Sequence, residues 1–252
     1  MRLNKIRHWL LGVTLLFLLS SNGLAQEFGK KVTFKITGKI ADLNAPARVL
    51  LYYGDHELTA ELKDGRFTME GEAVYGDVAL LYMDREGVIT ERPFIAEDRE
   101  SLVLRLEETE MTITSPDSLD KAVIENAPLT LQHLSYVDGI LEMQDKKEEM
   151  LGWYESLPAE SKEDERVKER YRQQVDNFNK WRLSKVHEFI LKYPNSLISY
   201  ESLRIYMARF DFPTADIGLM LYAILGDEIK KNDEVKELGE LIRTNQPIRL
   251  SL

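Results

Sequence analysis

The sequence predicts an α+β fold, in which an N-terminal antiparallel β-sandwich or barrel-like domain precedes an all-helical domain. Short segments that alternate in side-chain character fill residues 32–125, and turn signals separate them at a spacing typical of sandwiches and barrels. After Pro128 the apolar residues recur every three or four positions, as along one face of a helix. The chain contains no cysteine, so its core has to be sufficient without disulfides.

Strands are expected throughout the first half of the chain, ending with a short strand near residues 122–125. The other expected segments are 34–40, 48–53, 57–63, 66–71, 78–83, 88–95, 102–106 and 111–114. Asp64 and Gly65 join two of them, and this dipeptide accepts the positive φ angles of a tight turn. We therefore predict a structural turn at Asp64 and Gly65 that closes a β-hairpin.

Two long helices and three shorter ones are expected in the second half. The first covers residues 128–157 and ends at Pro158, and the second follows a capping box formed by Ser161 and Asp164. The second helix carries an apolar series that we interpret as core-facing, with a ligand groove as the alternative: Tyr171, Val175, Phe178, Trp181, Val186, Phe189 and Tyr193. The shorter helices are expected at 197–209, 214–225 and 233–243.

The N-terminus has the pattern of a secretory signal peptide. Three cations precede an apolar run at residues 10–19, and small residues follow at Gly23 and Ala25. We predict a signal peptide at 1–25, an antiparallel β domain at 26–126 and a helical domain at 127–252. The apolar run is about half of the roughly 20 residues that a membrane-spanning helix needs. A periplasmic or secreted protein, soluble after cleavage and without a stable membrane span, is expected.

The charge of the chain argues against nucleic acid as a partner. Removing Arg2, Lys5 and Arg7 with the leader leaves 30 of 33 basic residues against 43 acidic ones, a net charge of about −13. Phosphate binding is driven by cation-rich surfaces, which this composition does not favour.

The sequence contains no complete catalytic or metal-binding motif. Without cysteine, the chain has no thiol chemistry, and His187-Glu188 lacks a second histidine because position 191 is leucine. Ser118 and Lys121 match a serine-x-x-lysine pattern, but the partner motifs are missing, so a turn is the favoured interpretation. We predict no catalytic residue, no metal ligand and no cofactor.

Three tyrosines in the expected strands are candidates for contact with a ligand. Tyr52, Tyr53 and Tyr82 either form a binding face on the sheet or cover its core. The sequence leaves both possibilities open.

Four segments carry a resemblance to a known family. They are 34–40 (FKITGKI), 48–53 (RVLLYY), 62–71 (LKDGRFTMEG) and 188–199 (EFILKYPNSLIS). In these segments the chain resembles the domain of unknown function that precedes the thioredoxin domain in envelope thiol-disulfide oxidoreductases of the TlpA/ResA type. The resemblance implies the scaffold and an envelope location. It transfers no catalytic residue, because the Cys-x-x-Cys pair of those enzymes is absent.

These observations favour a noncatalytic exported module that binds another envelope protein or a small ligand. One alternative is an accessory subunit that acts in trans with a separate thioredoxin-like protein. Another is a cysteine-independent hydrolase that uses two carboxylates, because acidic residues are plentiful.

Overall fold

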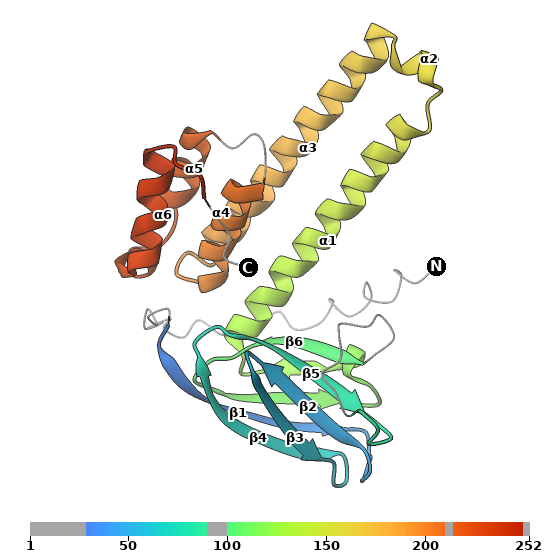
Figure 1. Ribbon diagram of the computed structural model, residues 1–252, viewed down its shortest axis with the longest axis vertical. Coiled ribbons are helices and arrows are strands. Elements are labelled where there is room, and N and C mark those ends of the chain that lie inside the picture. Colours follow the sequence, from blue (N-terminus) through green and yellow to red (C-terminus); the bar gives the residue numbers. More distant parts are fainter. Residues whose placement is uncertain (1–28, 90–99, 210–213, 249–252) are drawn as a thin grey trace.

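The computed structural model describes residues 29–89, 100–209 and 214–248. Two β-sheets form one end of the molecule, and the helices extend from it (Figure 1). The predicted α+β fold, with a β region followed by helices, is confirmed. The expected signal peptide and most of the expected strand at 88–95 lie outside the described residues, and residues 88 and 89 are not in a strand.

Each of the two sheets has four strands. One has the order β4 (Arg66–Val74), β1 (Lys31–Ile40), β7 (Glu110–Ser115) and β8 (Val123–Glu125). The other has the order β3 (His56–Glu61), β2 (Arg48–Tyr53), β5 (Val78–Asp84) and β6 (Ser101–Arg105). The pair β1 and β7 is parallel, which differs from the expected all-antiparallel arrangement. The difference arises because the chain passes through the second sheet before β7 returns beside β1.

Apolar side chains from both sheets form one shared core. Ile36 and Ile113 of the first sheet belong to the same buried cluster as Leu51 and Leu81 of the second, and none of the four is measurably exposed. Burying such a side chain contributes about 1.5–3 kcal/mol. The period-two alternation of the sequence thus becomes the inner faces of a two-sheet sandwich.

The turn at Asp64 and Gly65 is a corner between the sheets. Both residues have positive φ, +50° and +72°, and Lys63 and Arg66 exchange two backbone hydrogen bonds of 3.1 and 2.9 Å around them. The expected hairpin is present only as the antiparallel bridge between Lys63 and Arg66. It does not continue along the strands, because β3 pairs with β2 whereas β4 pairs with β1. Local alternation specifies a strand but not its partner, so the sequence did not reveal the change of sheet.

The helices follow the expected order. They are α1 (Pro128–Glu155), α2 (Ala159–Lys162), α3 (Glu165–Lys192), α4 (Leu197–Arg209), α5 (Ala215–Ala223) and α6 (Asp233–Arg243), with short 3₁₀ turns η1 (Leu119–Lys121) and η2 (Ile229–Lys231). The N-cap of α3 differs from the prediction: Asp164 accepts a 2.8 Å hydrogen bond from the backbone N–H of Arg166. Ser161 lies inside α2 instead, and a carboxylate also complements the positive end of the helix.

The helical half has a core of its own. Val186 and Ile190 of α3 pack in one buried cluster with Leu203 of α4 and Leu238 of α6. Beyond this cluster α1 and α3 continue as an antiparallel pair that projects away from the sheets, with α2 at its far end (Figure 1). None of residues 131–181, all of which the structure describes, is buried. Among the described residues, no helix combines the length and apolar character that a membrane crossing requires.

Candidate functional site

The three candidate tyrosines are buried and do not share one face. Tyr53 points into the sandwich, where its ring meets Phe34 edge-on at 5.4 Å. Tyr52 and Tyr82 lie on the other face of their sheet, 5.9 Å apart, in a small cluster with Leu50. Successive residues of a strand point to opposite faces, which separates Tyr52 from Tyr53. All three are at most 4% exposed, so they cover apolar clusters.

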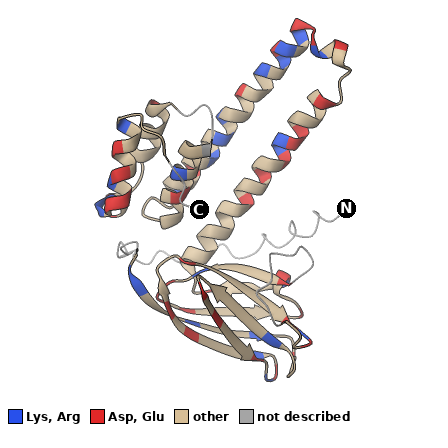
Figure 2. Ribbon diagram, in the orientation of Figure 1, with Lys and Arg blue, Asp and Glu red and all other residues tan. Residues whose placement is uncertain are grey.

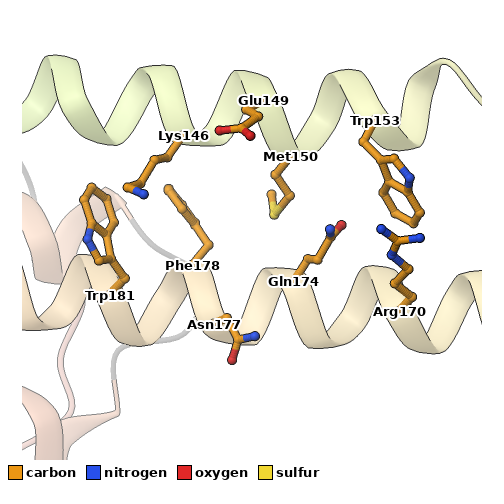
Figure 3. A pocket seen from close by; sticks show the side chains of 9 residues that line it. All are labelled: Lys146, Glu149, Met150, Trp153, Arg170, Gln174, Asn177, Phe178 and Trp181. Atoms are coloured by element: carbon orange, nitrogen blue, oxygen red, sulfur yellow. The ribbon is translucent and has the colours of Figure 1, made fainter.

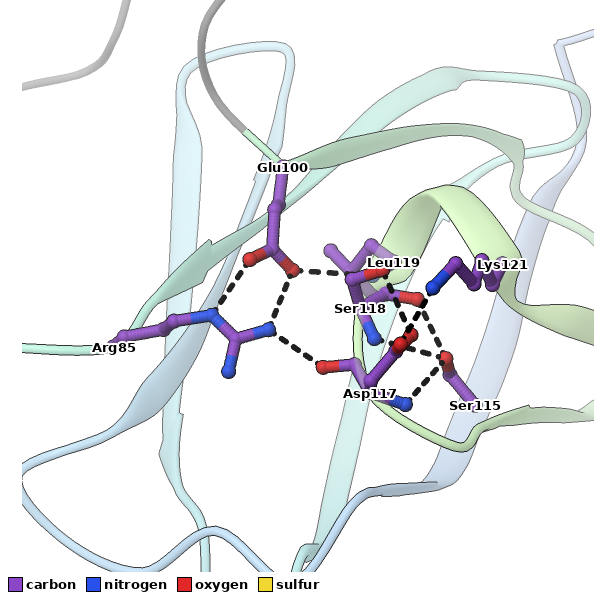
Figure 4. Close-up of polar contacts among 7 residues, drawn as sticks. All are labelled: Arg85, Glu100, Ser115, Asp117, Ser118, Leu119 and Lys121. Carbon is purple, nitrogen blue, oxygen red and sulfur yellow. Dashed lines mark hydrogen bonds and ion pairs between the residues drawn. The ribbon is translucent and has the colours of Figure 1, made fainter. Parts of the chain in front are cut away.

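The serine-x-x-lysine segment forms a polar network that fastens a loop to the sheet (Figure 4). Arg85 donates from Nε and Nη2 to the two oxygens of Glu100 at 2.6 and 3.1 Å. Its Nη2 also donates to the backbone oxygen of Asp117, and Glu100 accepts the backbone N–H of Leu119 at 3.2 Å. These contacts hold η1 beside the start of β6.

Lys121 is not placed to activate Ser118. The ammonium donates to Asp117 at 2.5 Å, and the Ser118 hydroxyl donates to the other oxygen of that carboxylate at 3.0 Å. The hydrogen bond to Asp117 raises the pKa of Lys121, which keeps the amine protonated. An activating amine has to accept the serine proton, so this arrangement is a turn with a polar cap.

Two carboxylates with opposed pKa shifts are both buried away from open surface. Burial works to raise the pKa of Asp84, but hydrogen bonds from the Ile89 N–H and Arg48 hold it below its usual value. Burial raises the pKa of Glu107 to about 7. They are 3% and 5% exposed, and neither lines either of the grooves described below. In the described part of the chain, no cluster of His, Asp and Glu could hold a metal ion.

Glu107 anchors the base of α1. Pro128 occupies the first turn of the helix, and Ala127 before it has no side-chain acceptor for the free backbone N–H groups. Glu107 supplies that acceptor, taking a 2.8 Å hydrogen bond from the Leu129 N–H. Thr130 exchanges hydrogen bonds of 2.9 and 3.2 Å with the backbone of Arg105. The direction in which α1 leaves the sheets is therefore set by the end of β6.

The base of α1 is a poorly solvated polar junction. Burial, with a contribution from Glu107, raises the pKa of Tyr75 to about 12. Burial, with a contribution from Arg105, lowers the pKa of His133 to about 4. His133 is therefore neutral near pH 7, and its Nδ1 accepts a 3.3 Å hydrogen bond from Nε of Arg105.

The projecting antiparallel pair of α1 and α3 is called the hairpin here, and the two helices are its arms. Contacts between residues at the same distance from the sheets hold the two arms together. Glu142 of α1 and Lys185 of α3 form an ion pair of 3.1 Å. Nearer the tip, the rings of Tyr154 and Tyr171 stack at 4.2 Å. The arms run antiparallel, so higher numbers in α1 meet lower numbers in α3. This seam leaves an open groove on each side of the hairpin.

The first of these, which we call the tryptophan groove, lies between the distal halves of α1 and α3 (Figure 3) and has a volume of about 500 Å³. It is lined by Lys146, Glu149, Met150, Trp153, Arg170, Gln174, Asn177, Phe178 and Trp181. Trp153 and Trp181 come from different helices and lie toward opposite ends of it (Figure 3). Both indoles are partly exposed. Aromatic rings in such a position supply large apolar contact area with little loss of side-chain entropy.

Cations of the facing helix cover both indoles. The Arg170 guanidinium lies 4.5 Å from the ring centre of Trp153, and the Lys146 ammonium lies 5.0 Å from that of Trp181. Such cation–π contacts contribute about 0.5–1 kcal/mol at exposed sites. The side-chain oxygen of Gln174 is shielded from solvent and has no hydrogen-bond partner among the described residues. The groove thus combines aromatic area with polar groups that a docked chain can use.

The second groove, which we call the α4-side groove, is formed by α1, α3 and α4 and has a volume of about 710 Å³. Its lining includes Ile140, Met143 and Leu151 of α1, Val175 of α3 and Ile205 of α4. Arg182 forms part of its wall, with its guanidinium 5.5 Å from the ring centre of Tyr206. Burial lowers the pKa of Arg182. Met150 and Phe178 line both grooves and so mark the seam between them.

The sequence indicated part of this surface. The core-facing interpretation of the second-helix series holds for Val186, which is 4% exposed, but not for Phe178 and Trp181, which are only partly buried and line the tryptophan groove. Trp153 was missed because α1 has no continuous apolar stripe around it. The sequence signal that could have revealed it is the small number of apolar residues in the distal part of α1, which is too small to bury that part of the helix.

The comparison with protein families finds a match for the β region and the start of α1 only. Residues 34–131 match a family model described as a domain of unknown function (DUF4369). The match runs from β1 into the first turn of α1, so the rest of the hairpin and the later helices lie outside it. No curated protein matches the sequence. The description of the family names no activity, and the expected relation to TlpA/ResA-type oxidoreductases stays a prediction.

Proposed function

We propose that this chain is a noncatalytic, exported interaction module that uses the α1/α3 hairpin to bind another protein of the cell envelope. The observation that carries the proposal is the exposure of the hairpin. Residues 131–181, all of which the structure describes, include no buried residue. An arm that has no fully buried side chain, yet keeps aromatic and aliphatic side chains, is typical of a recognition element.

The α4-side groove is the partner-binding surface in this proposal. Its walls come from three helices, its lining is mostly apolar, and Ile140 on its rim is 39% exposed. A groove between helices accepts the apolar face of an additional helix, with anchor residues spaced by three or four positions. The partner segment is therefore an amphipathic helix of an envelope protein. The volume of about 710 Å³ also lies within the range of small-molecule sites, so a small apolar ligand is the competing outcome.

The mechanism is positional and requires no chemical step. The β region and the buried junction at Arg105 and Glu107 fix the base of α1, so the hairpin is presented in one orientation. Binding then orders few additional residues, which reduces the entropic cost of association.

The experiment combines localisation with site-specific crosslinking of the full chain in cells. We expect the chain in the envelope fraction, with a mature N-terminus near Gln26. A photoreactive residue at Ile140 should form one discrete adduct with another protein. The matched control is Leu131, an exposed aliphatic residue on the same helix (46%) that lines neither groove.

Three results would contradict the proposal. The first is an uncleaved chain in the cytoplasm, which would contradict the proposed export. The second is equal labelling at Ile140 and Leu131, which would contradict the assignment of the α4-side groove as the binding surface. The third is an adduct with a small molecule alone, identified by mass spectrometry, which replaces the protein partner with a ligand.

A further inference from the structure

We propose that the tryptophan groove is the contact surface for a second copy of this chain, and that two hairpins pack in a two-fold symmetric four-helix bundle. The inference deepens the proposed function, because it also treats the hairpin as a recognition element. The tryptophan groove lies on the opposite side of the hairpin from the α4-side groove. The α4-side groove therefore stays open for the partner protein.

The two arms of the hairpin have opposite charge. Helix α1 carries six acidic and two basic side chains, whereas α3 carries four acidic and eight basic ones. In the ribbon of Figure 2, positions of acidic residues (red) outnumber basic ones on α1, and positions of basic residues (blue) outnumber acidic ones on α3. A surface with a negative arm beside a positive arm is complementary to itself after a two-fold rotation. Complementary potentials of this kind select the partner and its orientation.

Charge also decides which two-fold rotation is favourable. An axis parallel to the hairpin places α1 of one copy opposite α3 of the other, so that a helix with net negative charge lies against a helix with net positive charge at both contacts. An axis across the hairpin places α1 against α1 and α3 against α3, so that like charges meet. Like charges that face each other across an interface are unfavourable. The parallel axis is therefore favoured, and the two β regions lie at the same end of the dimer.

The contacts within one hairpin show that the arms match at each level. From base to tip, Glu142 meets Lys185, Lys146 meets Trp181, and Trp153 meets Arg170. Rotation about the parallel axis preserves height along the hairpin. Each of these α1 residues consequently comes opposite the same α3 residue of the second copy. The pairs that already form within the chain are the pairs that the interface offers again.

The apolar centre of the groove supplies the rest of the contact. Met150 and Phe178 lie between the two tryptophans on the seam of the hairpin (Figure 3). Two such strips facing each other give the apolar centre and charged rim of a four-helix bundle. The α4-side groove is a poorer surface for this packing, because α4 forms one of its walls.

The test uses the absence of cysteine from the chain. Glu149→Cys and Asn177→Cys place single thiols on α1 and α3 of the tryptophan groove, at positions that are exposed to solvent. We expect the unmodified chain to have twice the mass of one chain in light scattering at about 1–100 μM. Mild oxidation of the two variants mixed together should give mainly the mixed disulfide, because the thiols of different helices face each other.

The control pair is Gln144→Cys with Asn179→Cys, which places thiols on the same two helices but in the α4-side groove. It should give at least about tenfold less mixed disulfide. A monomer throughout the concentration range overturns the proposal. Predominant self-coupling of Glu149→Cys overturns the parallel axis, and efficient coupling of the control pair overturns the choice of groove. If the chain is a monomer but still forms the Ile140 adduct, the dimer is contradicted and the proposed function is not. If the chain is a dimer but forms no such adduct, only the proposed binding of another protein is contradicted.

Discussion

Arg105 at the end of β6 forms a two-pronged ion pair with Glu201 of α4, across 96 positions of sequence. The nitrogen–oxygen distances are 3.0 and 2.6 Å, and the arginine side chain is only 9% exposed. Its Nη1 also donates to the backbone oxygen of Gly76 at 2.9 Å. One side chain thus joins a strand, a turn and a helix of the second core, and it fixes the helical half to the β region.

We expect Arg105→Met to destabilise the protein by about 3 kcal/mol, because it leaves the Glu201 carboxylate and the Gly76 oxygen without their partner. Urea unfolding measures the change. A double-mutant cycle with Glu201→Gln should give a coupling of about 0.5–3 kcal/mol. The control is Lys231→Met, whose exposed pair with Glu228 should contribute less than about 1 kcal/mol. Equal losses for both pairs would mean that the buried junction does not join the two halves.

Gly65→Val should lower stability more than Gly54→Val. Both glycines have positive φ, +72° and +49°, so each substitution carries a backbone cost of about 1–3 kcal/mol. A Cβ at Gly65 would also collide with the carbonyl oxygen of Ala41, whereas at Gly54 no atom lies within 4 Å. Thermal melting of the two variants separates the steric cost from the cost of φ. Equal melting temperatures would show that the corner relaxes to accept a side chain.

The pH dependence of stability should contain a contribution from Glu107. Its pKa of about 7 in the folded state exceeds the usual 4.5, so the folded chain binds the extra proton between these values. Its stabilising contribution is therefore complete below about pH 4.5 and is lost as the pH rises through 7, with a slope of at most about 1.4 kcal/mol per pH unit. Glu107→Gln keeps an acceptor for the Leu129 N–H and should remove this slope in urea unfolding.

His133 gives the opposite trend and serves as the control. Its pKa of about 4 in the folded state lies below the usual 6.5, so its contribution is lost as the pH falls through this range. The two effects oppose each other below about pH 6.5. His133→Gln should therefore change the acid side of the profile and leave the slope between about pH 6.5 and 8 unaltered. A Glu107→Gln profile that matches the wild type in that range would contradict the shifted carboxyl.

Hydrogen exchange should divide the molecule at the hairpin. Residues 140–180 have no buried side chain, whereas the strands β1 and β5 carry fully buried ones. At concentrations low enough for a single copy, we expect amides of the distal hairpin to exchange at least about tenfold faster than those of the two strands, a difference of about 1.4 kcal/mol in opening free energy. Mass spectrometry of peptides resolves these segments. Uniform protection would indicate that the hairpin and the sandwich unfold together.

Local features of the fold were predictable from the sequence because they depend on neighbouring residues. The alternation at 34–40 specified β1, and Pro128 and the breaks after it delimited the helices. The positive-φ turn at Asp64 and Gly65 followed from their chemistry. The choice of sheet on either side of that turn did not, because pairing is decided by contacts between distant strands.

By itself, the sequence determined the α+β class, the order of the elements and the absence of cysteine, since composition and periodicity are local properties. Only the tertiary structure decided which aromatic residues are accessible. It buried Tyr52, Tyr53 and Tyr82, and it left Trp153 and Trp181 partly exposed on the α1/α3 hairpin. The physical reason is that burial depends on what packs against a side chain, and that neighbour usually lies far away in the sequence.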